Sequence, residues 1–306
     1  MRRSRQRLAA TLVALGVVAA LVSGCGSSSK SGSSASTTTA PAGPAPITIT
    51  AGDYKFLGVP KTMTAGIQTV TFVNQGQVQH EMVLVKVKPG TTEDVFFKGL
   101  GQWLNGGPLP AYAVAANGIG NTDPGTTTVA KFNLTSGDYI AFCTDTGTAG
   151  SKKDGAPHFA RGMTARFTVT GPGGDTAPTA DATITAHDYA FVLNGLKAGE
   201  QTIAFKNNGP EQWHFADINV FPKGVTAAQA TADVAKLIAS NGPPPAGVPQ
   251  PVPVVMSQVA SPGNGSTFQA TLLAGRAYVV LCFVSDRKGG PPHAIGHHMY
   301  KVFTVS

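Results

Sequence analysis

After its first 25 residues, the sequence lacks an apolar segment long enough to span a membrane. It also lacks a basic patch interleaved with aromatic residues, which argues against a nucleic-acid partner. The formal charge of +7 does not change this, because the residues from Cys25 onward include 19 basic and 16 acidic ones, a net charge of +3. The Gly-x-Ser-x-Gly, His-Glu-x-x-His and phosphate-loop motifs are missing as well, so none of these catalytic signatures is present.

The N-terminus has the pattern of an export signal. Four arginines within the first seven residues precede an uncharged, mostly apolar stretch from Leu8 to Val22. The segment Leu21-Val22-Ser23-Gly24-Cys25 resembles the bacterial lipobox, which implies cleavage before Cys25 and a diacylglycerol on its thiol. An ordinary signal peptide with a chance cysteine is the alternative. We therefore expect an extracytoplasmic protein that is anchored to the cell membrane by lipid on Cys25.

Composition and repetition together predict the domain organisation. Residues 26–46 are rich in Ser, Thr, Gly and Pro and carry one charge, which predicts a flexible tether behind the signal peptide of residues 1–25. Beyond them the chain repeats at a period of about 135 residues. The repeat predicts one domain over 47–170, a linker over 171–180 and a second domain over 181–306.

Several pairs of segments carry this internal repeat. The segment Ala51–Phe56 matches Ala186–Phe191, and Tyr139–Cys143 matches Tyr278–Cys282. The dipeptide at 157–158 matches the one at 292–293, which is Pro-His in both. Each copy therefore has a counterpart for every segment that carries chemistry in the other.

Each copy is expected to be an all-β sandwich with one short helical insertion. Short apolar runs bounded by turn residues dominate, as in sandwiches. Helical spacing occurs once per copy, at Phe96, Leu100, Trp103 and Leu104 and again at Ala230, Val234, Leu237 and Ile238. Thr226 and Gln229 have the spacing of a capping box. We expect both helical stripes to pack on the sandwich.

Histidine, cysteine and methionine recur at equivalent positions. With Cys25 assigned to lipid, one thiol remains in each copy, and a disulfide between matching sites of two domains is geometrically demanding. The two sets are His80, Cys143, His158 and Met163 in the first copy and His214, Cys282, His293 and Met299 in the second. Two imidazoles, a thiolate and a distant thioether are the ligand types of a blue-copper site. Taken singly, each residue also fits the role of a buried core side chain.

Both copies resemble cupredoxins of the plastocyanin and azurin type, over nearly the whole of 47–170 and 181–306. The resemblance rests on the turn Asn74-Gln75-Gly76-Gln77-Val78-Gln79-His80, on the strand Gly137-Asp138-Tyr139-Ile140-Ala141-Phe142-Cys143, and on the loop Pro157-His158-Phe159-Ala160-Arg161-Gly162-Met163. It implies tandem Greek-key β-sandwiches that bind copper in one or two type 1-like sites. It further implies that the two histidines and the cysteine of each set are the strong ligands and the methionine is the axial one.

Two features depart from the family pattern. Fourteen residues separate Cys143 from His158, and ten separate Cys282 from His293, so both loops are longer than in plastocyanins. In the second copy five residues lie between His293 and Met299, and His297 or His298 is an alternative ligand there. His187 has no counterpart in the first copy and is expected at the surface.

The resulting function hypothesis is electron transfer or copper handling at the outer face of the membrane. The partner would be a redox or copper-transfer protein, and in the electron-transfer version His158 and its neighbours would form the exposed edge. A metal-free surface module and a copper storage or resistance protein are the alternatives. No histidine adjoins Cys143 or Cys282 to supply a second copper centre, so the sequence predicts that the chain is not an enzyme.

Overall fold

The computed structural model describes residues 44–147, 155–173, 178–240 and 242–306. The predicted signal peptide, Cys25 and all but the end of the tether lie outside these residues, as does part of the 171–180 linker. The residues from Ala42 to Ser306 group into one compact unit. Within the described residues, no helix combines the length and the apolar character needed to cross a membrane.

Strands dominate the described residues, as the sequence predicts. The first half contains β1 (Ile47–Gly52), β2 (Lys55–Leu57), β3 (Thr62–Thr64), β4 (Gly66–Asn74), β5 (His80–Val87), α1 (Glu93–Leu104), β6 (Ala113–Thr122), β7 (Thr127–Leu134), β8 (Gly137–Phe142), the 3₁₀ turn η1 (His158–Arg161) and β9 (Thr164–Thr170). The second half contains β10 (Ala182–His187), β11 (Ala190–Asn194), β12 (Gly199–Asn207), β13 (Asp217–Val220), α2 (Ala227–Ser240), β14 (Val252–Met256), β15 (Gly265–Leu272), β16 (Ala277–Leu281), α3 (His293–Gly296) and β17 (Tyr300–Thr304).

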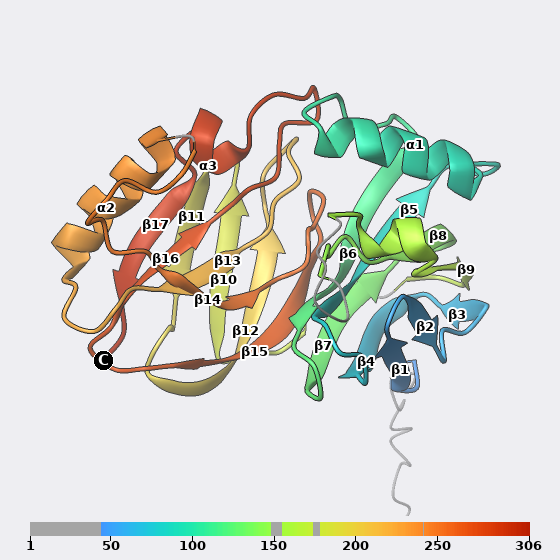
Figure 1. The fold of residues 1–306 in the computed structure, drawn as a ribbon. Helices are drawn as coiled ribbons and strands as arrows, with labels where there is room; N and C mark the ends of the chain where they lie inside the picture. Colours follow the sequence, from blue (N-terminus) through green and yellow to red (C-terminus); the bar gives the residue numbers. More distant parts are fainter. Residues whose placement is uncertain (1–43, 148–154, 174–177, 241) are drawn as a thin grey trace, which may run out of the picture. The chain divides into compact units, whose positions relative to one another are not determined.

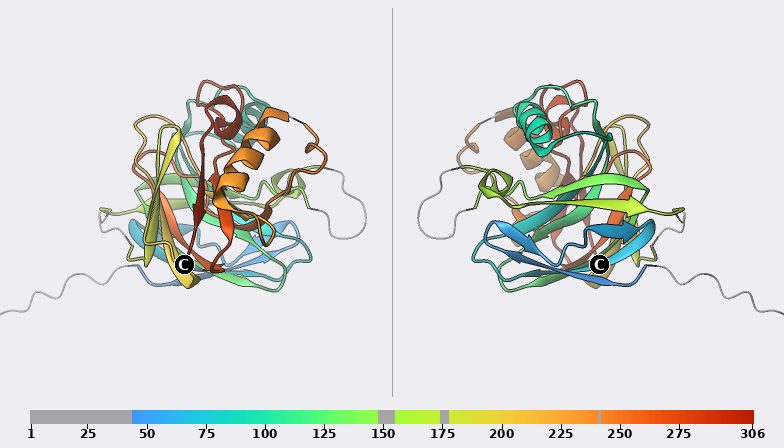
Figure 2. Two further views of the ribbon diagram at one scale, coloured as in Figure 1. Left: turned by 90° about the vertical axis from the view of Figure 1, so that its left-hand side faces the viewer. Right: turned by 90° about the vertical axis from the view of Figure 1, so that its right-hand side faces the viewer.

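The strands form three sheets, and one of them runs through both halves (Figure 1). Its order is β11-β10-β12-β15-β7-β4-β1-β2, so four strands come from each half. The five-stranded sheet β3-β9-β8-β5-β6 packs against the four strands of the first half, β7, β4, β1 and β2. The four-stranded sheet β14-β13-β16-β17 packs against the four strands of the second half. Both views of Figure 2 show α1 and α3 at the upper edge, away from β1 and β2. The predicted all-β class, with a helix added to each sandwich, is confirmed.

Strands β15 and β7 join the two halves. Ser266 on β15 pairs with Phe132 on β7, and the backbone N–H of Lys131 donates to the hydroxyl of Thr267 over 2.9 Å. Because this pairing continues the sheet, neither half leaves an open edge at the junction.

The core continues across the same junction. Strand β5 is buried on both faces, since Met82 and Leu84 pack in the core of the first half while Val83 and Val85 join a cluster that includes residues of the second half. A strand buried on both faces needs an uninterrupted apolar run, and Met82 to Val85 supplies one.

Both predicted helices are present, and they pack differently. Helix α2 covers a cluster of its own half through Ala230 and Val234. Helix α1 buries Phe96 against Phe142 of its own half, but its Trp103 ring meets Trp213 of the second half at 5.8 Å and 80°. The apolar face of α1 therefore packs against both halves, whereas the sequence predicted contact with its own sandwich alone.

Candidate copper centres

In the first half, strand ends bring the predicted ligands together. His80 begins β5, and Cys143 directly follows β8, which runs antiparallel beside β5, so both lie at the same end of the sheet. His158 begins η1. The N–H of the next residue, Phe159, donates to the carbonyl of Cys143 over 2.9 Å, while the N–H of Met163 donates to the carbonyl of His158 over 3.1 Å. Backbone hydrogen bonds thus hold all four predicted residues in one place.

The second half repeats this arrangement. Cys282 directly follows β16, and the N–H of Ala294 donates to its carbonyl over 2.8 Å. The N–H of Met299 donates to the carbonyl of His293 over 3.1 Å, and the N–H of Cys282 donates to the carbonyl of Met299 over 3.2 Å. His214 forms an isolated β-bridge with Ala260.

The three ligand atoms of each set form a small triangle. In the first, the Nδ1 atoms of His80 and His158 are 3.0 Å apart, and the Sγ of Cys143 lies 4.0 and 3.4 Å from them, respectively. In the second, the Nδ1 atoms of His214 and His293 are 3.1 Å apart, and the Sγ of Cys282 lies 3.7 and 3.5 Å from them. The point equidistant from the three atoms lies about 2 Å from each, close to the lengths of roughly 2.0–2.3 Å that metal ions make with imidazole nitrogen and thiolate sulfur.

Hydrogen bonds on the far side of the first-half imidazoles fix their orientation. The Nε2 of His80 lies 3.4 Å from a carboxylate oxygen of Asp53, and the Nε2 of His158 lies 2.6 Å from the carbonyl of Gly147. Since a carboxylate and a carbonyl only accept, both Nε2 atoms carry the proton. Each Nδ1 is then left with a lone pair that points to the centre of the triangle.

In the second half, carboxylates accept from the Nε2 atoms of both imidazoles and fix their orientation. The Nε2 of His214 lies 3.3 Å from Asp188, and the Nε2 of His293 lies 3.2 Å from Asp286. Asp286 is held in turn by the hydroxyl of Tyr189, which donates over 2.8 Å, and it also contacts the Nε2 of His297 at 3.1 Å.

This tautomer pattern provides a test of whether a metal fits. Two lone pairs that face each other at 3.0 or 3.1 Å repel, and in neither set does either Nδ1 carry a proton to share. A cation at the equidistant point turns this repulsion into two bonds. The donor set of two imidazoles and one thiol suits copper, so both sets fit the metal and support copper as the cofactor of one or two sites.

An asparagine shapes the turn before the first histidine of each set. The side-chain amide of Asn74 donates to the carbonyls of Val78 and Thr122, both over 2.8 Å, and its oxygen accepts from the N–H of Gly76 over 2.8 Å. Asn207 makes the corresponding three bonds in the second half. A side chain at Gly76 is excluded, because a Cβ there would lie 2.6 Å from the Nε2 of His80.

Burial controls the protonation of both sets in the metal-free protein. Desolvation raises the pKa of the Cys282 thiol to about 12 and also raises the pKa of the Cys143 thiol, to which the nearby Glu81 carboxylate contributes. Desolvation lowers the pKa of His214. Desolvation, followed by repulsion from the neighbouring His214, lowers the pKa of His293 to about 4. At neutral pH these thiols are therefore protonated while these imidazoles are neutral, so metal binding has to displace a proton from each cysteine.

The remaining predicted residues occupy distinct places. Met163 and Met299, the predicted axial ligands, are fully buried. His297 and His298 lie outside the triangle; His297 stacks on Tyr189 at 3.6 Å, and His298 is exposed with φ of 53°.

Two further outcomes concern exposure. His187 is exposed, as expected. His158 is fully buried, so the expectation that it forms an exposed edge is wrong; its Nε2 points to the carbonyl of Gly147 rather than to solvent.

A repeated Asp-Tyr pair supports the sites, although neither residue is among the predicted ones. Asp53 and Asp188 accept from the first histidine of their sets, while Tyr54 and Tyr189 place a ring edge-on to the second histidine, His158 or His293, at 5.1 and 5.3 Å. Both tyrosines have positive φ, 63° and 70°. The sequence contained a signal for this pair, because Asp-Tyr occurs at the same place in both copies. Only the fold, however, shows that the pair lies next to the predicted ligands.

Comparison with known proteins finds similar solved structures. No protein-family model and no curated protein matches the chain. A reduced auracyanin from the photosynthetic bacterium Roseiflexus castenholzii is 29% identical over 41% of this chain and 97% of its own, with a TM-score of 0.28. Auracyanin A from Chloroflexus aurantiacus, a "blue" copper protein, is 25% identical over 42% of this chain and all of its own, with a TM-score of 0.29. The copper nitrite reductase of Nitrosomonas europaea is 16% identical over 86% and 94%, with a TM-score of 0.24.

The topology and the two ligand triangles define the class of protein. The chain folds as two tandem cupredoxin-like halves, and each half carries a His-Cys-His set that fits a type 1 copper site.

The prediction that the chain is not an enzyme is contradicted by these comparisons. A multicopper oxidase and a copper nitrite reductase, both enzymes, match across more than four fifths of this chain. The prediction rested on the lack, within one chain, of histidines next to Cys143 and Cys282 and of other catalytic motifs. That criterion does not cover ligands that lie elsewhere in the sequence or on another chain, so it does not exclude an enzyme.

Proposed function

We propose that the protein is an extracytoplasmic copper protein, tethered to the membrane by lipid on Cys25, that transfers electrons to or from a protein partner. The observation that carries the proposal is the pair of buried triangles in which two Nδ1 atoms and one Sγ converge. Bound copper would supply a one-electron couple between Cu(II) and Cu(I). The two histidines and the cysteine of each set would hold the metal, with Met163 or Met299 as axial ligand.

The structure supports rapid electron exchange through rigidity. The ligands are tied by backbone hydrogen bonds to each other and to strand ends, and the histidine, cysteine and methionine side chains of both sets are fully buried. A ligand cage that cannot rearrange imposes nearly the same geometry on both oxidation states of the metal. Little reorganisation then accompanies electron transfer.

The test is the visible spectrum after addition of Cu(II) to the full chain carrying Cys25→Ser. We expect an intense thiolate-to-copper band, part of which disappears in Cys143→Ser and part in Cys282→Ser. Loss of the whole band in one single variant assigns copper to that half alone. Tight Cu(I) binding without the band would support storage or delivery of copper instead, and a chain that binds no metal would refute the copper function.

A further inference from the structure

An open pocket of about 320 Å³ lies between helix α2 and the four-stranded sheet of the second half. Val234, Leu237 and Ile238 line it from α2, and Val279 and Leu281 line it from β16. Its volume falls within the range of roughly 300–1,000 Å³ that is typical of small-molecule sites. The pocket is therefore large enough for a small organic molecule.

Strand β13 directs one carboxylate into this space. Asp217 pairs with Leu281 across the antiparallel strands β13 and β16, so the two side chains lie on the same face of the sheet. The next residue, Ile218, faces the other way and packs in the core cluster that the two halves share. Among the described residues that line the pocket, Asp217 alone has an ionisable side chain.

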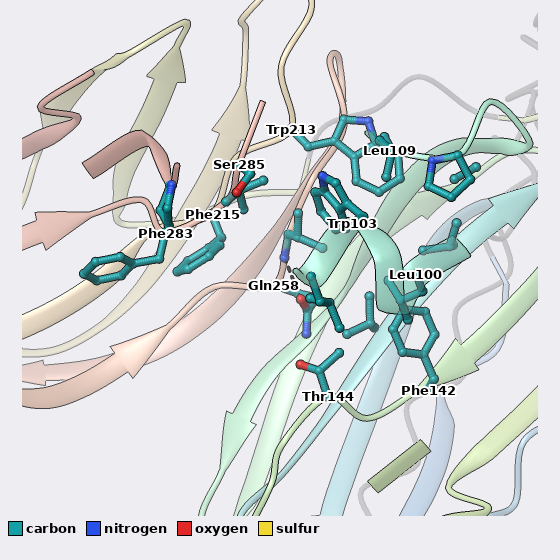
Figure 3. A pocket seen from close by; sticks show the side chains of 18 of the residues that line it. Leu100, Trp103, Leu109, Phe142, Thr144, Trp213, Phe215, Gln258, Phe283 and Ser285 are labelled. Carbon is teal, nitrogen blue, oxygen red and sulfur yellow. Dashed lines mark hydrogen bonds between the residues drawn. The ribbon is translucent and has the colours of Figure 1, made fainter. Parts of the chain in front are cut away.

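The Asp217 carboxylate is within reach of an occupant. The residue is only partly buried, and neither of its carboxylate oxygens is among the described buried atoms that lack a partner. A neighbouring cavity of about 360 Å³, which shares Phe283 as a wall, is different (Figure 3). Its carboxylate, Glu81, is buried and already accepts from Thr144 and Gln258. Asp217 is thus the carboxylate that has room for a partner from outside the chain.

No cationic side chain pairs with Asp217 in the part of the chain that the structure describes. Burial raises the pKa of the Asp217 carboxyl, and the Asn219 side chain beside it acts in the opposite direction without cancelling the shift. The ionised carboxylate therefore lacks full compensation for the water it has lost, and a bound cation would stabilise it.

The rest of the pocket suits a hydrocarbon chain. Five aliphatic side chains line it from α2 and β16, and Pro251, Phe283 and Ile295 extend the apolar wall. A bare metal cation such as Ca²⁺ or Mg²⁺ needs several oxygen ligands, which this lining does not supply. One carboxylate within an aliphatic lining instead selects an organic cation with an apolar body.

We propose that this pocket binds a small primary alkylamine, whose ammonium group donates to the Asp217 carboxylate and whose alkyl chain packs between α2 and β16. A primary ammonium is compact and has three donors, so it can bind the carboxylate and still donate to water at the open side of the pocket. Binding needs no metal, so the proposal is independent of the copper function.

The test is isothermal titration calorimetry at pH 7.5 on the metal-free full chain carrying Cys25→Ser. The probes are hexylamine, which is protonated at this pH as a lysine side chain is, and the matched 1-hexanol and hexanoate. We expect hexylamine to bind with a stoichiometry of one and at least tenfold more tightly than 1-hexanol, because a hydrogen bond to a charged group is lost in the alcohol. Hexanoate should bind more weakly than either. Butylamine, with two methylene groups fewer, should bind about tenfold more weakly than hexylamine.

Variants separate the carboxylate contact from simple partitioning into an apolar space. Asp217→Asn keeps the shape but removes the charge, and we expect it to weaken hexylamine at least tenfold while 1-hexanol changes less than twofold. Glu200→Gln, at an exposed carboxylate that does not line the pocket, is the matched control and should leave both affinities unchanged. Leu237→Trp fills part of the pocket and should weaken both probes, with near-UV circular dichroism as the check on folding.

Three results would overturn the proposal. They are the absence of saturable binding of hexylamine, equal affinity for hexylamine and 1-hexanol in the unsubstituted chain, and an equal loss of hexylamine affinity in Asp217→Asn and Glu200→Gln. Because Asp217→Asn changes a single atom, the comparison stands even if Leu237→Trp does not fold.

Discussion

A single carboxylate orients the first histidine of each set. Asp53 and Asp188 sit opposite the Nε2 atoms of His80 and His214, at 3.4 and 3.3 Å. Holding the proton on Nε2 keeps Nδ1 free for a metal, and the negative charge behind the ring increases its basicity. The same carboxylates brace the preceding turn; Asp53 accepts from the N–H of Gln77 over 2.8 Å.

Removing this carboxylate should weaken copper binding in one half alone. We expect Asp53→Ala to lower the Cu(II) affinity of the first site by roughly 10- to 100-fold, the usual effect of losing a partner of a metal-bound histidine. The measurement is a competition titration against a chelator in a Cys282→Ser background, which leaves only the first site. Asp188→Ala is the matched control in that background, and an equal loss there would show that the effect is not local.

The His-Cys-His clusters could be predicted from the sequence, but the groups that support them could not. His80, Cys143 and His158 each have a counterpart about 135 residues later, and that coincidence of residue types is enough to indicate metal chemistry. Asp53 recurs as well, yet it lies 27 residues before His80, and no local pattern links a residue in a turn to a strand so distant. The partner of His158, the carbonyl of Gly147, carries no side-chain signal at all.

At the scale of elements, the helices were predictable because helical spacing and capping are local. Helix α2 begins one residue after Thr226, whose hydroxyl accepts from the N–H of Gln229 over 3.2 Å, as the capping-box spacing indicates. Helix α1 begins after Thr92, whose hydroxyl accepts from the N–H of Val95. What each helix covers was not predictable, because an apolar stripe does not specify its partner.

The cap of α2 makes a separate prediction. Thr226→Ala removes the acceptor for an otherwise unpaired N–H of the first turn, so we expect the free energy of unfolding to fall by about 1 kcal/mol. Thr226→Ser keeps the hydroxyl and should remain close to the unsubstituted chain. Urea unfolding of the metal-free protein followed by far-UV circular dichroism measures both, and a Thr226→Ala chain as stable as the Ser variant contradicts the capping role.

At the scale of the whole unit from Ala42 to Ser306, the two repeats are joined more closely than their sequence suggests. Val83 and Val85 face the shared cluster while Leu84 faces the first sandwich, and all three are apolar, so no alternation marks a solvent-exposed face. A repeat reveals two copies of a fold. Whether the copies share a sheet and a core depends on side chains such as Trp103 and Trp213, whose meeting no sequence pattern predicts.

This shared interior keeps imidazoles neutral when the metal is missing, so acid should destabilise the metal-free fold. The pKa of His293 is about 4 in the folded protein, lowered by desolvation from 6.5. Between these values the unfolded chain binds a proton that the folded chain does not, so stability rises with pH there and is lost as the pH falls from 6.5 toward 4. Burial raises the pKa of Glu81, which acts in the opposite direction because the folded state then takes up a proton more readily.

The histidine contribution can be isolated by comparison with a variant that does not titrate. We expect the free energy of unfolding of the unsubstituted metal-free chain to fall by up to about 3 kcal/mol more than that of His293→Gln between pH 7 and pH 4. Urea unfolding at half-unit steps of pH measures the difference, in which the contribution of Glu81 cancels because both chains retain it. Parallel pH profiles for the two chains would mean that the pKa of His293 is the same in the folded and the unfolded chain, which would contradict the lowering of this pKa by burial.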